Sequence, residues 1–293
     1  MKHYIKLLRV TNWVKNIFVF VPLVFSKHLF DFDFFVKTLI AFFSFSFAAS
    51  FVYIINDIYD AEKDFHHPTK KNRPIASGIV SKKQAFNFAL FILILLIPLL
   101  IISQNNYFIF ITLVYLLINF FYSKTLKNIV IVDIFCIAIG FMLRIIGGAV
   151  IISVYISSWL ILTTLFLSLF LAVMKRRAEL SSELSSQKQR VVLEDYSINF
   201  IDQISAITGA GVIISYALYT VADRTIIMFG SEYFVITTLF VVFGIFRYMF
   251  LVIRKNIGEN IVDVLFRDIP MIINIIFYVL VSLIIIYHKI YVN

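Results

Sequence analysis

The chain has 293 residues, of which 61% are hydrophobic and only 15% are charged, and its mean hydropathy is +0.95. No soluble core of this size needs such an excess of apolar residues, so the composition excludes a soluble globular protein and indicates that the bilayer is its solvent. On a soluble protein the net charge of +9 would suggest a nucleic-acid partner. On a membrane protein the distribution of this charge among the loops has to be considered first, and we expect no nucleic-acid partner.

Repeated apolar runs of roughly 20 residues predict a single all-α transmembrane domain over residues 1–293, with nine spanning helices. The basic, amphipathic residues 1–16 lack a small-residue cleavage pattern, so we expect the first span to be retained. The only cysteine, Cys136, lies in an apolar run, which excludes disulfides and a paired-thiol metal site. The predicted spans are 16–35, 36–55, 85–103, 107–122, 129–152, 157–174, 204–222, 233–253 and 269–287.

The loops between these spans predict how the chain lies in the membrane. Of the 26 basic residues, 20 fall on the N-terminal segment and on alternate loops, chiefly 56–84 and 175–203. Because retained cytoplasmic loops carry the basic excess, we expect a cytoplasmic N-terminus and, after nine spans, a C-terminus outside. Thirteen of the 17 acidic residues lie on or beside the same face. A face rich in both signs suits a metal-bound polyphosphate, and the alternative is ordinary solvated loop charge.

The most informative segment is the polar run that continues directly out of the second span. Asn56, Asp60 and Asp64 are four residues apart, so on a helix each step drifts by only about 40°. We expect their oxygens to project from one side and to hold Mg²⁺, whereas Asp57 and Glu62 point elsewhere and are second choices. The alternative interpretation is a solvated helix end.

Basic residues follow the acidic run within about ten residues. Lys70, Lys71 and Arg73 come next, and the pairs His67-Pro68 and Arg73-Pro74 stop the helix and turn the chain back. The sequence therefore predicts that carboxylates and cations fold together here.

These residues resemble the first Asp-rich motif of the UbiA-type intramembrane prenyltransferases, written N-D-x-x-D-x-x-x-D, which Asn56, Asp57, Asp60 and Asp64 match without a gap. Within that family the chain looks most similar to the decaprenyl-phosphate phosphoribosyltransferases. The supporting segments are Arg9 to Phe20 (RVTNWVKNIFVF), His67 to Gly78 (HPTKKNRPIASG), Tyr122 to Asp133 (YSKTLKNIVIVD), Gly140 to Gly148 (GFMLRIIGG) and Lys175 to Glu179 (KRRAE). The last hundred residues resemble the family mainly in span pattern.

The resemblance implies nine helices around a central cavity and an active site with two Mg²⁺ ions. It also implies that the protein lies in a bacterial cell membrane and that this site faces the cytoplasm. It implies transfer of a 5-phosphoribosyl group from water-soluble 5-phosphoribosyl 1-diphosphate to a polyprenyl phosphate, as in cell-envelope biosynthesis. Elsewhere in the family a polyprenyl diphosphate donates to an aromatic acceptor, and this alternative stays open. A lipid transporter is a third alternative, although it would place polar residues near the bilayer midplane in paired, broken helices.

A second Asp-rich motif of the family falls near the end of the sixth span, and here the chain departs from the pattern. Glu179 and Glu183 keep a four-residue spacing, but a basic triplet precedes them. A second Mg²⁺ site and a positive-inside anchor with ordinary i, i+4 pairing are both consistent with this segment. Asp195 and Asp202 compete for the ligand role.

Other polar residues are candidates for binding substrate phosphates. Arg144 lies in mid-span, where an unpaired cation is costly, so we expect it to face the cavity and bind a phosphate or a carboxylate such as Asp133. Lys15 and Tyr122 lie near span ends and can reach a polar headgroup, although interfacial anchoring explains Lys15 equally well. The full predicted phosphate-binding set is Lys15, Asn16, Lys70, Arg73, Tyr122, Lys127, Arg144, Lys175 and Arg176.

Overall fold

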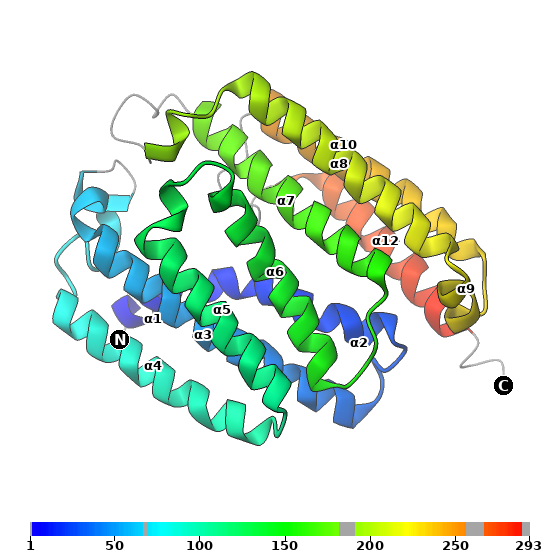
Figure 1. Ribbon diagram of the computed structural model, residues 1–293, viewed down its shortest axis with the longest axis horizontal. Coiled ribbons are helices and arrows are strands. Elements are labelled where there is room, and N and C mark those ends of the chain that lie inside the picture. The colour runs from blue at the N-terminus through cyan, green and yellow to red at the C-terminus, as the bar shows by residue number, and fades with distance from the viewer. Residues whose placement is uncertain (1, 67–69, 182–190, 256–266, 289–293) are drawn as a thin grey trace. The chain divides into compact units, whose positions relative to one another are not determined.

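The computed structural model describes residues 2–66, 70–181, 191–255 and 267–288. Every regular element in these ranges is helical (Figure 1). The described residues contain nine helical segments that are long and apolar enough to cross a membrane, which confirms the predicted number. Contacts divide the chain into two compact units, Met1–Tyr155 and Ile156–Asn293, and each is described by itself. The orientation of the termini, the central cavity and the single domain stay predictions.

Unit 1 contains five candidate spans, the second of which is the long helix that carries the acidic run. In Figure 1 α3 lies beside α4 and α5, and α5 lies beside α6. Its elements are α1 (Lys2–Leu8), η1 (Val10–Phe20), α2 (Val21–Phe25), α3 (Phe32–Phe65), η2 (Lys70–Asn72), α4 (Lys82–Ile102), α5 (Asn106–Lys124), η3 (Leu126–Asn128) and α6 (Val132–Ile151).

The boundary between the first two spans differs from the prediction. The first span was expected to end at residue 35, but helical structure stops at Phe25 and α3 begins at Phe32. The cause is local, because the Asp31 carboxylate caps α3 by accepting from the backbone N–H groups of Asp33 and Phe34, at 3.1 and 3.3 Å. The same helix then runs on to Phe65, so the acidic residues lie on a continuous helix, as expected.

The segment η1 is a 3₁₀ helix of 11 residues, unusually long for this helix type, and it packs against α3 and α6. Side chains three apart eclipse on a 3₁₀ helix, and two members of one such row donate to α3. Trp13 Nε1 donates to Ser50 Oγ at 3.0 Å, and Asn16 Nδ2 donates to Ser46 Oγ at 2.9 Å. The small serines let the two backbones approach while satisfying polar groups away from water.

Unit 2 contains the remaining four candidate spans. α7 (Ser158–Ser181) packs along α8 (Ile198–Val221), and α10 (Thr238–Lys255) packs along α12 (Ile269–Tyr287). The shorter elements of this unit are η5 (Val191–Leu193), α9 (Asp223–Phe229) and η6 (Tyr233–Thr237).

An ion pair joins two helices of unit 2. Arg247 on α10 donates from Nε and Nη2 to the two carboxylate oxygens of Asp268, at 2.9 and 2.8 Å. Asp268 also caps α12 by accepting from the backbone N–H of Met271 at 3.1 Å. The hydrogen bond from Arg247 holds the pKa of Asp268 below its usual value.

The distribution of apolar side chains identifies lipid as the surroundings of these helices. α4 and α12 are the two most apolar candidate spans, yet they are among the least buried. On α4 the side chains of Ile94, Ile97 and Ile101 are more than half exposed. A water-soluble protein would not leave such continuous apolar faces uncovered, so the chain is an integral membrane protein.

We predict that Gly148→Ala destabilises unit 1. A Cβ at Gly148 would lie 2.1 Å from the backbone carbonyl oxygen of Val19 on η1, and a backbone atom cannot yield as a flexible side chain does. Overpacking of this kind costs about 1–3 kcal/mol or more, so the melting temperature in detergent should fall by several degrees. Gly140→Ala on the same helix is the control, because its Cβ would meet no atom nearer than 3.5 Å. Equal melting temperatures for the two variants would contradict the prediction.

Candidate active site

The last turns of α3 carry the acidic motif, and two of its carboxylates are buried. Asp57 and Asp64 are 3% and 5% exposed. A buried carboxylate is stable as an anion only when cations and hydrogen-bond donors compensate it. The partners of these side chains therefore determine what the motif can bind.

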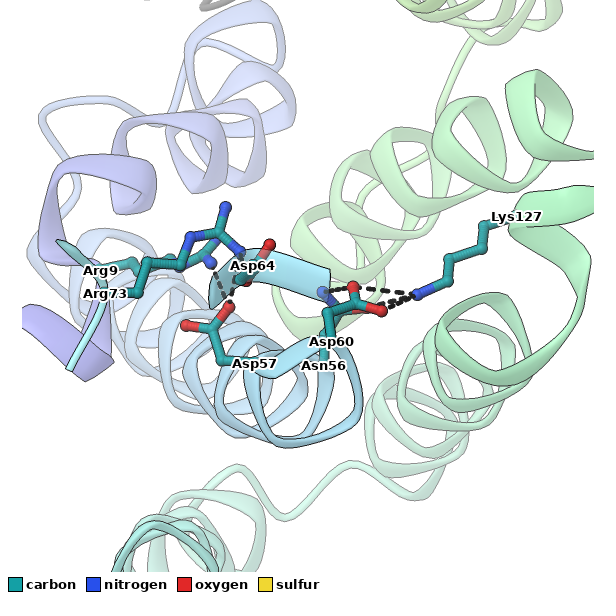
Figure 2. Close-up of polar contacts among 7 residues, drawn as sticks. All are labelled: Arg9, Asn56, Asp57, Asp60, Asp64, Arg73 and Lys127. Carbon is teal, nitrogen blue, oxygen red and sulfur yellow. Dashed lines mark hydrogen bonds and ion pairs between the residues drawn. The ribbon is translucent and has the colours of Figure 1, made fainter. Parts of the chain in front are cut away.

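Asp60 and Asn56 form one cluster with Lys127, the residue at the centre of η3. Lys127 Nζ lies 2.8 and 3.0 Å from the two carboxylate oxygens of Asp60 and 3.4 Å from Oδ1 of Asn56. Asn56 Nδ2 also donates to Asp60 Oδ2 at 2.9 Å. Figure 2 shows Lys127 reaching these two side chains from one side of α3. Lys127 is only 9% exposed, so little water screens the attraction between its ammonium and the Asp60 carboxylate.

Asp57 and Asp64 form a second cluster with two arginines on the other side of the helix (Figure 2). Asp57 Oδ1 accepts from Arg9 Nη2 at 2.5 Å and from Arg73 Nη1 at 3.1 Å. The same Arg73 nitrogen donates to Asp64 Oδ2 at 2.5 Å. One guanidinium thus bridges two buried carboxylates.

These two clusters correct the expectation that Asn56, Asp60 and Asp64 converge on one point. Two four-residue steps rotate a side chain by about 80° around an α-helix, whereas seven residues return to within about 20° of the starting direction. Asp64 therefore lies closer in direction to Asp57 than to Asn56, and it shares Arg73 with Asp57, while it stays within about 40° of Asp60. Glu62 points away from both clusters, as expected, because it is exposed and pairs with Lys82 at 2.9 Å.

The three cations come from segments remote in sequence, and two of these segments have strained backbone. Arg9 joins α1 to η1 with φ +51°, and Ile131, between η3 and α6, has φ +69°. A positive φ costs an L-residue on the order of 1–3 kcal/mol and persists only where the surrounding structure imposes it. The sequence did not single out Arg9 as a site residue, because no local pattern connects it to Asp57, 48 positions away.

Arg144 lies on α6 and is bound differently from the prediction. Its Nε donates to Asn16 Oδ1 at 2.6 Å and its Nη2 to the Tyr115 hydroxyl at 2.8 Å. Its Nη1 donates to the Gly140 carbonyl oxygen at 2.6 Å. These acceptors are neutral, and none of them is the carboxylate that was expected, such as Asp133. Arg144 is buried, so its guanidinium lies in a region with little water. The phosphate-binding role stays a prediction.

Three further predicted phosphate ligands lie in unit 1 and are half-buried. Lys15 is on η1 beside Asn16, Lys70 begins η2, and Tyr122 lies in the last turn of α5. Their roles are not tested by this geometry.

The predicted second motif lies at the end of α7, in unit 2, and its basic residues are paired with acids. Arg176 donates to Glu179, which also lies 3.9 Å from Lys175 Nζ, and Arg177 Nε donates to Asp202 at 2.8 Å. The pairs of Glu179 are the local pairs of the anchoring interpretation, whereas Arg177–Asp202 joins α7 to α8. Asp195 is exposed. Glu183 lies outside the described residues, and a second metal site stays a prediction.

The donors on α3 fit Mg²⁺ in chemistry, although they do not form a ready cage. The atoms with which Asn56, Asp57, Asp60 and Asp64 can bind a metal are oxygens, which is the ligand type that Mg²⁺ prefers. Among the described residues no three carboxylate, histidine or cysteine side chains converge tightly enough to hold an ion alone. Magnesium sites in phosphate-handling enzymes use one or two carboxylates and complete their coordination with phosphate oxygens and water. The geometry suits a metal that arrives with a diphosphate.

Comparison with known proteins gives relatives that span much of the chain. Decaprenyl-phosphate phosphoribosyltransferase from Corynebacterium glutamicum is 35% identical over 219 residues, 73% of this chain and 66% of that enzyme. The enzyme of the same name from Mycolicibacterium smegmatis is 33% identical over 222 residues, 73% of this chain and 69% of that enzyme. The chain thus matches about two thirds of the length of these relatives.

Solved structures and a family profile cover nearly the whole fold. A UbiA homolog from Archaeoglobus fulgidus, solved bound to GPP and Mg²⁺, superposes with a TM-score of 0.70 at 18% identity, covering 97% of this chain and 99% of that one. The profile of the UbiA prenyltransferase family matches residues 17–267, which include both acidic clusters of α3. The chain therefore belongs to the UbiA prenyltransferase family, a family of membrane-embedded transferases.

Proposed function

We propose that this protein transfers a 5-phosphoribosyl group from 5-phosphoribosyl 1-diphosphate to a polyprenyl phosphate and releases diphosphate. The observation that carries the proposal is the sequence identity of 35% and 33% to two enzymes named for that reaction. The site agrees with it in chemistry, because oxygen ligands and cations lie together at one end of a membrane helix. A water-soluble donor and a lipid acceptor can meet at such a position.

Each cluster on α3 has a distinct role in the proposal. Lys127 and Arg73 are the donors that stabilise the charge on the leaving diphosphate, since each already binds an anionic oxygen in this structure. Asn56, Asp60 and Asp64 are the proposed metal ligands, and Asp57 keeps Arg9 and Arg73 in place. The proposed substrate contacts also include Lys15, Asn16, Lys70, Tyr122, Arg144, Lys175 and Arg176.

Mg²⁺, when bound with the donor, would neutralise the diphosphate as its bond to carbon lengthens. In unit 1 the residues that would hold it are Asn56, Asp60 and Asp64. A second ion, with Glu179 and Glu183, remains part of the proposal.

The reaction breaks the bond between ribose C1 and the diphosphate oxygen, and it forms a bond between C1 and an oxygen of the polyprenyl phosphate. The departing diphosphate takes the electron pair of the broken bond. A phosphate monoester is an anion at neutral pH, so its attack needs no protein general base. This fits the two clusters on α3, whose titratable groups are carboxylates, lysine and arginine.

We further propose that the site faces the cytoplasm of a bacterial cell membrane, within a single catalytic domain. Most basic residues lie on the N-terminal segment and on alternate loops. In the sequence, the acidic motif of α3 and Lys127 of η3 lie in or next to these same loops. A role in cell-envelope biosynthesis follows if the product is a phosphoribosylated lipid.

A second candidate is transfer of a polyprenyl group from its diphosphate to an aromatic acceptor. The UbiA homolog solved with GPP and Mg²⁺ shares the fold and favours this chemistry. Both reactions use a diphosphate leaving group, so the α3 motif serves either, and the products distinguish them.

The first prediction from the proposal concerns product and metal. Purified protein with Mg²⁺, polyprenyl phosphate and radiolabelled 5-phosphoribosyl 1-diphosphate should put label into the organic phase, and a chelator should abolish it. Asp60→Ala and Asp64→Ala should each lower turnover at least about a hundredfold, because charge stabilisation at the leaving group is lost.

Glu62→Ala is the matched control, because Glu62 is on the same helix but is exposed and pairs only with Lys82 among the described residues. It should retain activity. Transfer to an aromatic acid from a prenyl diphosphate, with no labelled lipid from the ribosyl donor, would contradict the proposed donor.

The second prediction concerns Lys127. Lys127→Met removes the only cation within hydrogen-bonding distance of Asp60 among the described residues, so kcat should fall by about 10²–10³-fold in the same assay. Lys127→Arg should recover part of the loss. Lys124→Met is the control, because Lys124 is exposed on the same connection. Equal turnover in the Lys124 and Lys127 variants would exclude a role for Lys127 at the leaving group.

A further inference from the structure

Lys15 differs from the other cations near the acidic motif that are not exposed, because it has no partner among the residues that the structure describes. Arg9, Arg73 and Lys127 bind carboxylates, and Arg144 uses all its nitrogens. Lys15 is half-buried on η1 and makes no hydrogen bond or ion pair with the described part of the chain.

The helix type places Lys15 between two anchored neighbours. On a 3₁₀ helix every third side chain falls in one row, so Asn12, Lys15 and Phe18 follow the same side of η1, and Arg9 immediately precedes its first residue. At one end Arg9 donates to Asp57 of α3. At the other end Phe18 packs edge-on against Phe141 of α6, with ring centroids 5.2 Å apart. Lys15 thus lies on the segment between Arg9, which reaches the acidic motif, and Phe18, which packs on α6.

The groups that surround Lys15 favour an anion. Arg9 and Arg144 are both near enough to repel its ammonium, and among the described residues no carboxylate acts on it in the opposite sense. The Arg9 guanidinium lies over the ring of Tyr53, at 5.1 Å, and that of Arg144 over Tyr115, at 4.8 Å. The two tyrosine side chains are close enough to interact electrostatically, so their hydroxyls line the same region as the three cations.

A structural role does not account for this arrangement. A partly buried cation beside two others raises the free energy of the folded state unless an anion compensates it. Asp57 is shared by Arg9 and Arg73, and the acceptors of Arg144 are neutral, so unit 1 leaves positive charge in this region. That charge attracts a ligand of opposite sign.

We propose that Lys15, with Arg144, Arg9 and the hydroxyls of Tyr53 and Tyr115, forms a binding site for a phosphate monoester, separate from the diphosphate contacts of Asp60 and Lys127. The inference rests on the proposed function and deepens it. That reaction needs a monoester on each substrate, the 5-phosphate of the donor and the phosphate of the lipid acceptor. A prenyl diphosphate with an aromatic acceptor offers no monoester. The site therefore determines specificity for the substrate pair.

The experiment compares Lys15→Met with wild-type full-length protein in three measurements. Binding of ribose 5-phosphate and of geranyl phosphate, each without diphosphate, reports the site directly and needs no turnover. At least one of these probes should bind wild type, and Lys15→Met should weaken that binding at least about tenfold. Lys15→Arg should retain most of the affinity.

Steady-state assays identify which substrate supplies the phosphate. A rise of about tenfold or more in KM for 5-phosphoribosyl 1-diphosphate alone assigns the site to the 5-phosphate of the donor. The same rise for polyprenyl phosphate alone assigns it to the acceptor. Either result supports the proposal.

Thermal stability separates a ligand-binding lysine from a structural one. Without ligand, Lys15→Met should melt no lower than wild type, because the change removes an uncompensated cation. Lys6→Met, at an exposed lysine of the same N-terminal segment, is the control for all measurements. The proposal is overturned if Lys15→Met melts lower than both, or if it changes neither probe binding nor either KM beyond the Lys6 variant. Because probe binding needs no reaction, failure of the proposed transfer is distinguishable from failure of this site.

Discussion

Carboxylates at the buried end of a membrane helix need nearby cations, and unit 1 is organised around that need. Asp57 and Asp64 are almost completely buried, and three cations from three other segments compensate the acidic face of α3. Burying an unpaired charge costs several kcal/mol, so the segments that carry Arg9, Arg73 and Lys127 are held in place partly by the acids they meet. The positive φ values at Arg9 and Ile131 show that these connections accept backbone strain.

Under the proposed function, the same compensation prepares the site for a polyanion. The acids already orient Lys127 and Arg73, so a diphosphate that replaced a carboxylate contact would meet donors whose reorganisation is small. The cations contact different faces of α3: Lys127 lies on one side, and Arg9 and Arg73 lie on the other (Figure 2). The Arg144 network adds positive charge that its neutral acceptors leave uncancelled. A membrane helix thus ends in a region where carboxylates and cations lie together.

Much of the fold follows from the sequence because span length is a local property. Runs of about 20 apolar residues predicted the nine candidate spans, and the four-residue spacing predicted that α3 continues past the membrane. The first boundary was wrong because hydropathy carries no information on where a helix is capped. Asp31 sets the start of α3 by accepting two backbone hydrogen bonds. This capping role was not apparent from an aspartate in a run of phenylalanines.

For the site, the sequence by itself determined which residue types are present and on which helix they lie. It singled out Asn56, Asp60, Asp64, Arg73 and Lys127 as candidates, since motif spacing and loop charge are visible along the chain. Only the tertiary structure decided how they pair. Asp57 joined Asp64 through seven-residue periodicity and a shared arginine, and Arg144 took Asn16 and Tyr115 as partners. Contacts between residues tens of positions apart depend on how helices pack, and linear spacing holds no record of that packing.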